Sequence, residues 1–376
     1  MTARPRVVVA GLGDSGLLVA GHLARHADVV GVSTQPGLVS GQELGLRLAD
    51  PDAWRRHYWV GFDRYRRLDR VRTVHAELVG LDPRGRVVRM RTPDGDEQEE
   101  PYDVLVVATG TTNGFWRRPE LRTAAQVEER LRADHERLAA VAAAGGAVAV
   151  VGGGASAVAA AAHLARRWPG ARVGLWFPGD RALPHHHPRV WGTVARRLAS
   201  LGIALHPGHR AVLPDGDGLE EWGTGPVAWS TGQDPADADL VLWAVGRVRP
   251  STGWLPPDLL DEHGFVRVDP DLRLPGLPRH YAVGDVAATD PLRSSARNRA
   301  DRLVARNVRA ELAGGALATY RPARHRWGSV LGPQPNGLQV FTPSGAAVRV
   351  PALLERRLLR PVAVDLGIYG GVRRAR

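Results

Sequence analysis

Residues 7–16 read VVVAGLGDSG, and residues 147–157 read AVAVVGGGASA. In each stretch a run of small apolar residues ends in closely spaced glycines. A helical pattern follows in each case, Leu17 to Arg25 after the first and Val158 to Arg167 after the second. A further apolar run comes after each helical pattern. This repeat of strand, glycine turn, helix and strand predicts two α/β units with parallel sheets.

The glycines at the end of each first strand indicate a nucleotide ligand. Glycine lets the backbone turn sharply and approach a pyrophosphate, while the unpaired amides of the following helix offer donors and a positive dipole end. One GxGxxG pattern is weak evidence, but two copies between strand and helix are much stronger. We therefore predict two Rossmann-like dinucleotide-binding domains.

Both copies depart from the usual pattern at the ribose. An acidic residue is expected about twenty residues after the first glycine, but the strands end in Ser33-Thr34 and Phe177-Pro178. The hydroxyls of the first pair can still bond a ribose. At the second site both NADH and NADPH stay open, and Arg181 is a candidate for contact with a 2′-phosphate. Asp14 is a further departure, because a carboxylate at a helix start repels a bound phosphate.

Composition restricts the chemistry. The 376 residues can form two or three domains, and the lack of cysteine excludes disulfides, thiolate nucleophiles and zinc ribbons. The net charge of +11 comes from arginine alone, in doublets such as Arg55-Arg56 that are dispersed along the chain. We interpret this as codon bias and predict no nucleic-acid partner.

Met1 to Arg6 leads directly into the first strand without a signal peptide, which favours a cytoplasmic location.

Three more motifs occur in a family order. Residues 102–110 read YDVLVVATG, residues 240–246 read LVLWAVG and residues 280–287 read HYAVGDVA. Together with the two glycine loops they resemble the FAD-dependent flavoproteins of the pyridine nucleotide-disulfide oxidoreductase-like family, over about residues 5 to 313. Without cysteine, the chain is most similar to the branch of type II NADH dehydrogenases and apoptosis-inducing-factor-like proteins.

The resemblance implies FAD at the first loop and NAD(P)H at the second. The flavin would take a hydride at N5 and pass electrons directly to a small acceptor, most often a quinone. It also implies a three-layer fold with one domain inserted in the other, divided as FAD domain 1–120, NAD(P)H domain 121–254, FAD domain 255–313 and a small C-terminal unit 314–376. The candidate cofactor-binding residues are Gly11, Gly13, Ser15, Gly16, Ser33, Thr34, Ala108, Thr109, Gly110, Gly152, Gly154, Ala155, Ser156, Ala157, Arg181, Gly246, Gly284, Asp285 and Val286.

Two other functions remain open at this stage. A flavin monooxygenase or ferredoxin-type reductase would share both nucleotide sites. A non-catalytic nucleotide-binding regulator would explain Asp14, the missing acids and the lack of a lysine near flavin N5. No motif identifies a catalytic residue, although Trp116 is a candidate for the acceptor pocket. The adjacent His185, His186 and His187 do not predict a metal site, because consecutive side chains diverge.

The last part of the chain is basic and partly amphipathic. It contains Leu353-Leu354, Leu358-Leu359 and several arginines. We expect Pro361 and Gly370-Gly371 to break any long helix here. We interpret the segment as a solvated tail, with peripheral contact to the inner face of a membrane as the alternative. A homodimer is also open.

Overall fold

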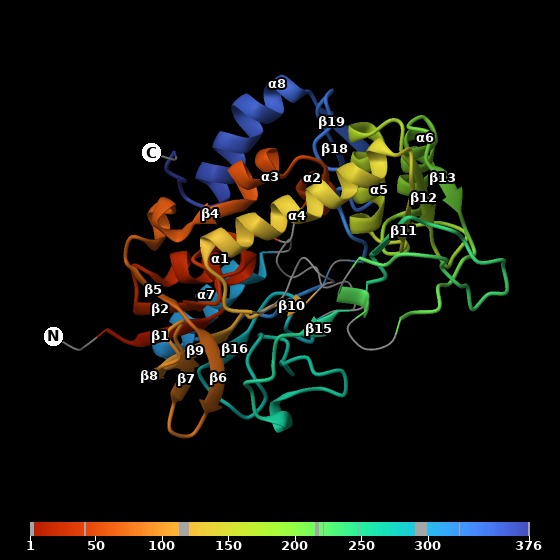
Figure 1. Cartoon of the computed structure of the whole chain (residues 1–376). Helices are drawn as coiled ribbons and strands as arrows, with labels where there is room; N and C mark the ends of the chain where they lie inside the picture. The colour runs from red at the N-terminus through yellow and green to blue at the C-terminus, as the bar shows by residue number, and fades with distance from the viewer. Residues whose placement is uncertain are drawn as a thin grey trace.

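The computed structural model describes residues 4–40, 43–112, 120–214, 218–220, 222–246, 248–289, 299–322 and 324–374. Two parallel sheets organise the molecule, one in the N-terminal part of the chain and one in the middle (Figure 1). This confirms the predicted α/β class with Rossmann-like parallel sheets.

The first sheet is the centre of a three-layer unit. Its strands lie in the order β16 (His280–Ala282), β9 (Val104–Val107), β1 (Arg6–Ala10), β2 (Asp28–Ser33) and β5 (Val71–His75), all parallel.

Alternation along β1 separates the two faces of this sheet. Val7 and Val9 pack toward the helices α1 (Asp14–Leu23) and α7 (Ala300–Leu312). Val8 packs on the other face. That face is covered by an antiparallel sheet of β6 (Glu77–Asp82), β7 (Val87–Arg91) and β8 (Glu97–Pro101).

The second sheet has the strand order β13 (Ala204–His206), β12 (Arg172–Trp176), β11 (Ala147–Val151) and β14 (Leu240–Trp243). Residues of α5 (Ala155–Arg167) and α6 (Pro188–Ala199) pack in the core cluster on one face of this sheet. On the other face, Val227 and Trp229 pack against Val151.

Short elements join the two units. The chain crosses through β10 (Thr111–Thr112) and returns through β15 (Arg249–Pro250), and these strands pair antiparallel. Helix α4 (Ala124–Ala143) leads into β11 and starts with a capping box of Thr123 and Gln126. The remaining short elements are β3 (Gly37–Val39), α2 (Leu44–Ala49), α3 (Pro51–Tyr58), β4 (Trp59–Gly61), η1 (Phe62–Arg64), η2 (Arg66–Leu68), η3 (Gly218–Glu220) and η4 (Pro257–Leu259).

The C-terminal part contains an antiparallel sheet and a long helical segment. The sheet has β17 (Gly328–Ser329), β18 (Leu338–Phe341) and β19 (Ala347–Val350). The helical segment has α8 (Ala352–Leu354) followed by η5 (Glu355–Ile368), which winds as a π-helix and lies along the top of Figure 1.

The expectation that Pro361 breaks this helix is wrong. Pro361 lies inside η5, where its missing amide removes only one backbone donor, and neighbouring side chains anchor the helix. The Arg360 guanidinium donates to the His57 carbonyl at 2.8 Å and lies 4.7 Å from the centre of the Tyr58 ring. The helix instead ends before Gly370, whose φ is +72°. Within the described residues, no helix is long and apolar enough to cross a membrane.

Candidate functional site

The three glycines of the first loop have different roles. Gly11 has φ +98°, and a β-carbon there would stand 2.6 Å from the Ala108 carbonyl oxygen. At Gly16 a β-carbon would collide with the carbonyl of Gly11. Gly13 has no neighbour within 4 Å of that position, so its backbone is open to a ligand. The first and third glycines therefore bring strand and helix together, and the second leaves room for a phosphate.

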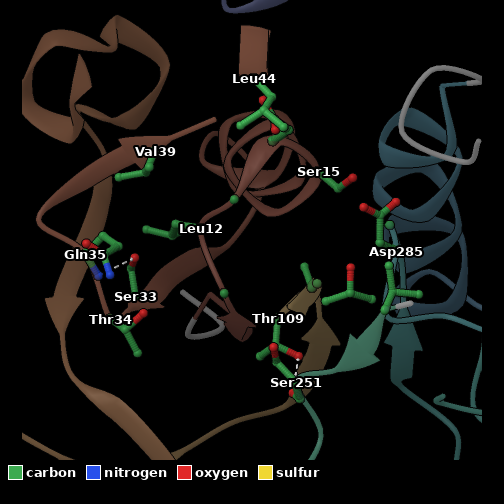
Figure 2. Close-up of a pocket in the computed structure, with 18 of the residues that line it drawn as sticks. Leu12, Ser15, Ser33, Thr34, Gln35, Val39, Leu44, Thr109, Ser251 and Asp285 are labelled. Carbon is green, nitrogen blue, oxygen red and sulfur yellow. Dashed lines mark hydrogen bonds between the residues drawn. The ribbon is translucent and has the colours of Figure 1, made fainter. Parts of the chain in front are cut away.

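This loop meets the two other motifs of the first unit. Gly284, with φ +85°, lies against Ser15, and Figure 2 shows the Ser15 and Asp285 side chains next to each other at one side of the pocket. The Thr109 hydroxyl donates to the Ser251 carbonyl at 2.7 Å and fixes the turn after β9. Segments that are far apart in the sequence thus converge at the start of α1.

The segment after Asp285 differs from what the resemblance implies. In the family motif that residues 280–287 resemble, a helix starts after the aspartate, but here residues 284–289 form a turn, and the next described helix starts at Ala300. Val286 has no exposed surface, because its side chain belongs to the core below the sheet. Its side chain is therefore not available to a ligand. The candidate Trp116 lies outside the described residues.

The expected ribose end of the site holds a residue that the sequence analysis missed. The Ser33 hydroxyl accepts from the Gln35 amide at 3.1 Å, and the Thr34 carbonyl accepts from the Arg122 amide at 3.0 Å. The Gln35 side-chain amide donates to the Glu120 carbonyl at 2.9 Å. Its Oε1 atom is buried and, within the part of the chain that is described, has no hydrogen-bond donor. A buried acceptor facing a ligand site fits a ribose hydroxyl. The signal for Gln35 was its place just beyond the end of β2.

The first glycine loop and the helix start that follows the second loop line a single cavity of about 840 Å³. Gly11, Gly13 and Ser15 contribute from the first loop, and Ala155 and Ser156 contribute from the start of α5. The close packing of α2 on α5 makes this possible, because Gly45 lies directly against the Ala159 carbonyl. The cavity is within the size range of ligand and cofactor sites.

Other polar and aromatic groups of the cavity come from segments that the sequence did not single out. Glu43 starts α2 in a left-handed conformation with φ +57°, and Arg47 on the same helix is 5% exposed. The Arg47 guanidinium lies 5.3 Å from the centre of the Trp54 ring. Arg326 and Trp327 reach the cavity from the C-terminal unit. No short motif marks these residues, because they become neighbours only through the packing of α2, α5 and the C-terminal sheet.

The second glycine loop repeats the geometry of the first. Gly152 has φ +143°, and a β-carbon there would collide with the Ala244 carbonyl, just before the turn at Gly246. Gly154 is exposed and has nothing within 4 Å of a β-carbon. Ala157 stands at the third glycine position and is completely buried between helix and sheet. The loop is therefore shaped like a dinucleotide-binding turn, with alanine tolerated at the helix–sheet contact.

Arg181 lies beside this loop, but its guanidinium bonds to the protein itself. It donates to the carbonyls of Leu183 at 3.2 Å, Pro184 at 3.3 Å and His186 at 3.4 Å. The Leu183 amide in turn donates to the Gly153 carbonyl at 2.6 Å. Arg181 therefore shapes the segment that borders the loop.

The histidine run after Arg181 has separate roles. His186 is buried at the edge of the cavity, and the His187 side chain accepts from the Arg189 amide at the start of α6. Burial and the nearby Arg326 lower the pKa of His185. The described residues contain no group of three or more potential metal-ligating side chains.

The comparisons with known proteins agree with this geometry. A family model described as pyridine nucleotide-disulphide oxidoreductase matches residues 5–307. The chain belongs to this family. The match confirms the family that the motifs resemble, a family of oxidoreductases whose cofactors are FAD and NAD(P)H.

This family member is similar to several characterised proteins. It is 28% identical over 173 residues to the type II NADH:quinone oxidoreductase Ndh of Mycobacterium tuberculosis, a match that covers 41% of this chain and 34% of that protein. The fold is similar to reduced Bacillus anthracis CoADR-RHD, with a TM-score of 0.65, 18% identity and coverage of 95% of this chain and 63% of the other. It is also similar to NDH2 from Plasmodium falciparum in complex with NADH, with a TM-score of 0.60, 14% identity and coverage of 76% and 64%. This chain thus spans less than two thirds of each of these three proteins.

Proposed function

We propose that this protein is an FAD-dependent NAD(P)H oxidoreductase that passes electrons from the flavin directly to a small acceptor such as a quinone. The observation that carries the proposal is that the first glycine loop and the start of α5, directly after the second loop, line one cavity in a chain without cysteine. A nucleotide at the second loop and a flavin at the first would then face each other with no thiol relay between them.

The residues of the first unit fit FAD. The backbone amides of Gly13 and Ser15, at the start of α1, suit the pyrophosphate, and the buried Gln35 acceptor suits the adenosine ribose. Asp285 would accept hydrogen bonds from the ribityl chain. The turn at Thr109-Gly110 would border the ring system. The bound flavin supplies the hydride chemistry, and these residues orient it.

The second loop would hold NAD(P)H at Gly152, Gly154 and Ser156, and the turn at Gly246 would border this nucleotide. We also propose the domain division at residues 120, 254 and 313, in which the pairing of β16 with β9 returns the chain to the first sheet. Because the chain has no lysine, we propose Arg47, a buried cation that lines the cavity, for the place of the lysine expected near the flavin.

A quinone is the acceptor that we propose, since the curated relative is described as an NADH:quinone oxidoreductase. The outer surface of the C-terminal helix supports a location on a membrane. Its exposed apolar side chains are Leu353, Leu354, Leu358, Val362, Leu366 and Ile368. The exposed Arg356 and Arg357 flank them. An apolar helix face with flanking arginines suits the surface of an anionic bilayer.

The test is the visible spectrum of the purified protein before and after anaerobic addition of NADH or NADPH. We expect flavin absorption that bleaches on reduction and returns when a soluble quinone is added. If the flavin bleaches but the reduced protein reacts only with oxygen and an organic substrate, the protein would be a flavin monooxygenase. If it reacts only with ferredoxin, it would be a ferredoxin-type reductase. A folded protein that binds no FAD would refute the proposal and favour the nucleotide-binding regulator.

A further inference from the structure

Asp14 occupies an unusual place for a carboxylate. It is the first residue of α1, directly after the open glycine Gly13, where the backbone amides of the helix start are proposed to hold the pyrophosphate of FAD. A negative side chain that turned toward this phosphate would weaken its binding, and the low dielectric of a buried site increases the repulsion.

The structure shows what holds this carboxylate. The Ser40 hydroxyl lies 3.0 Å and 3.2 Å from its two oxygens and donates to it. The Tyr369 hydroxyl donates from 3.5 Å. Ser40 follows β3, and Tyr369 follows the C-terminal helix, so the two donors approach from different parts of the chain.

Tyr369 is fixed by the packing of the C-terminal segment on the first unit. Its ring lies 5.3 Å from the Tyr65 ring, centre to centre. Directly after it, the Gly371 carbonyl accepts from the Arg66 amide at 3.0 Å. The Arg373 guanidinium then bonds both carboxylate oxygens of Asp69, at 2.8 Å and 2.6 Å. The donor is therefore present at Asp14 only while this segment is docked.

The Tyr369 hydroxyl is well suited to donate. Burial, and then the negative charge of Asp14, raise the pKa of Tyr369 well above its ordinary value. The hydroxyl thus keeps its proton throughout the pH range in which proteins usually work, and it can act toward Asp14 only as a neutral donor.

We infer that Tyr369 is a positioning residue for the flavin site: with Ser40, it holds the Asp14 carboxylate away from the phosphate position at the start of α1. The inference rests on the proposed FAD site and adds a residue that lies outside every nucleotide motif. By linkage, docking of the C-terminal segment strengthens FAD binding, and bound FAD strengthens docking.

The experiment compares FAD release from the holoproteins of the wild type, Tyr369→Phe, Asp14→Asn and the double variant. Release after dilution is followed by the rise in flavin fluorescence. We expect Tyr369→Phe to release FAD about threefold to fivefold faster, because the hydrogen bond that is lost is long, at 3.5 Å. In the Asp14→Asn background the same change should have no effect, because the repelling charge is gone.

Two further variants make the result specific. Tyr102→Phe is the matched control, because it also removes one buried tyrosine hydroxyl, bonded to His280 at 2.9 Å, away from Asp14. It should release FAD like the wild type. Ser40→Ala should act like Tyr369→Phe, and it provides the test if Tyr369→Phe does not fold.

A wild-type release rate in both Tyr369→Phe and Ser40→Ala would overturn the inference. Equal acceleration by Tyr369→Phe with and without Asp14 would also overturn it, because Tyr369 would then act only through general packing. A wild-type protein that binds no FAD would refute the proposed function, and this inference with it.

Discussion

Gly284 lies directly against Ser15: a β-carbon on Gly284 would stand 2.9 Å from the Ser15 hydroxyl oxygen. Ser15 belongs to the first turn of α1, whereas Gly284 follows the edge strand β16. This contact joins the two halves of the proposed FAD site, and it also sets the position of the neighbouring Asp285.

Substitution of Gly284 by alanine should therefore weaken FAD binding. The change adds strain at φ +85° and pushes the Ser15 helix start away from Asp285. We expect the FAD dissociation constant to rise about tenfold or more, measured by flavin fluorescence. Gly276→Ala is the matched control, because φ is +71° there but nothing lies within 4 Å. Equal effects of the two variants would contradict the role of the contact.

Gln35 gives a prediction for the other end of the same cofactor. Gln35→Leu removes the buried acceptor and keeps the size of the side chain, so the ribose loses a hydrogen-bond partner. FAD binding should weaken about fivefold or more, measured by titration of the apoprotein with FAD. Gln98→Leu, on the exposed strand β8, should bind like the wild type. If Gln35→Leu bound FAD normally, the ribose would have to lie elsewhere.

The contrast between Gly284 and Gln35 shows how far the sequence could go. The glycine motifs predict the two parallel sheets and the contacts at Gly11 and Gly152, because close backbone approach requires glycine whatever the rest of the chain does. Gln35 was missed although its place just beyond the end of β2 was a signal, because its side chain is not acidic. Arg47 and Trp327 were missed, because no local pattern distinguishes them from ordinary surface residues. Their place in the cavity follows from long-range packing.

The C-terminal helix was missed for a related reason. Pro361 and the glycines around it favour a broken segment when only local preferences are considered. In the structure, the contacts of Arg360 with His57 and Tyr58 offset the lost backbone bond. Tertiary contacts of this kind override local propensity.

For Arg181, the structure changes the expected result of substitution. From the sequence, Arg181→Ala would raise the Michaelis constant for NADPH much more than for NADH. Because the guanidinium holds the carbonyls of Leu183, Pro184 and His186 together, we now expect both constants to rise by a similar factor. Steady-state kinetics of the Arg181→Ala variant with NADH and with NADPH will measure the two Michaelis constants. A rise confined to NADPH would show that Arg181 leaves these carbonyls to bind the 2′-phosphate.

His163 predicts a pH dependence of stability. It is completely buried on α5, and burial, followed by the charge of Arg166, lowers its pKa from 6.5 to about 3. Between these values the unfolded chain binds a proton that the folded chain does not, so the free energy of unfolding falls as the pH drops below 6.5. The slope from this group approaches about 1.4 kcal/mol per pH unit.

Urea unfolding at pH 7, 6 and 5 measures this contribution. Burial and the charge of Arg360 also lower the pKa of His57, to about 4. His57 therefore contributes to the loss of stability over the same pH range, and His163→Gln should remove only part of the dependence of the free energy of unfolding on pH. His263→Gln, at an exposed position, should leave the slope unchanged. A wild-type slope in His163→Gln would mean that His163 is protonated in the folded protein.

The outward face of the C-terminal helix leads to the last prediction. We expect the protein to sediment with vesicles that contain phosphatidylglycerol, and a smaller fraction to sediment at high salt. The triple variant Leu358→Glu/Val362→Glu/Leu366→Glu should remain in solution. These side chains are each more than half exposed, so the substitutions should leave the fold intact, and Val212→Glu at a similarly exposed position is the control. If the triple variant sedimented like the wild type, the helix would not be the contact. If instead the wild type formed dimers without lipid and the triple variant did not, a second copy of the chain would cover this face.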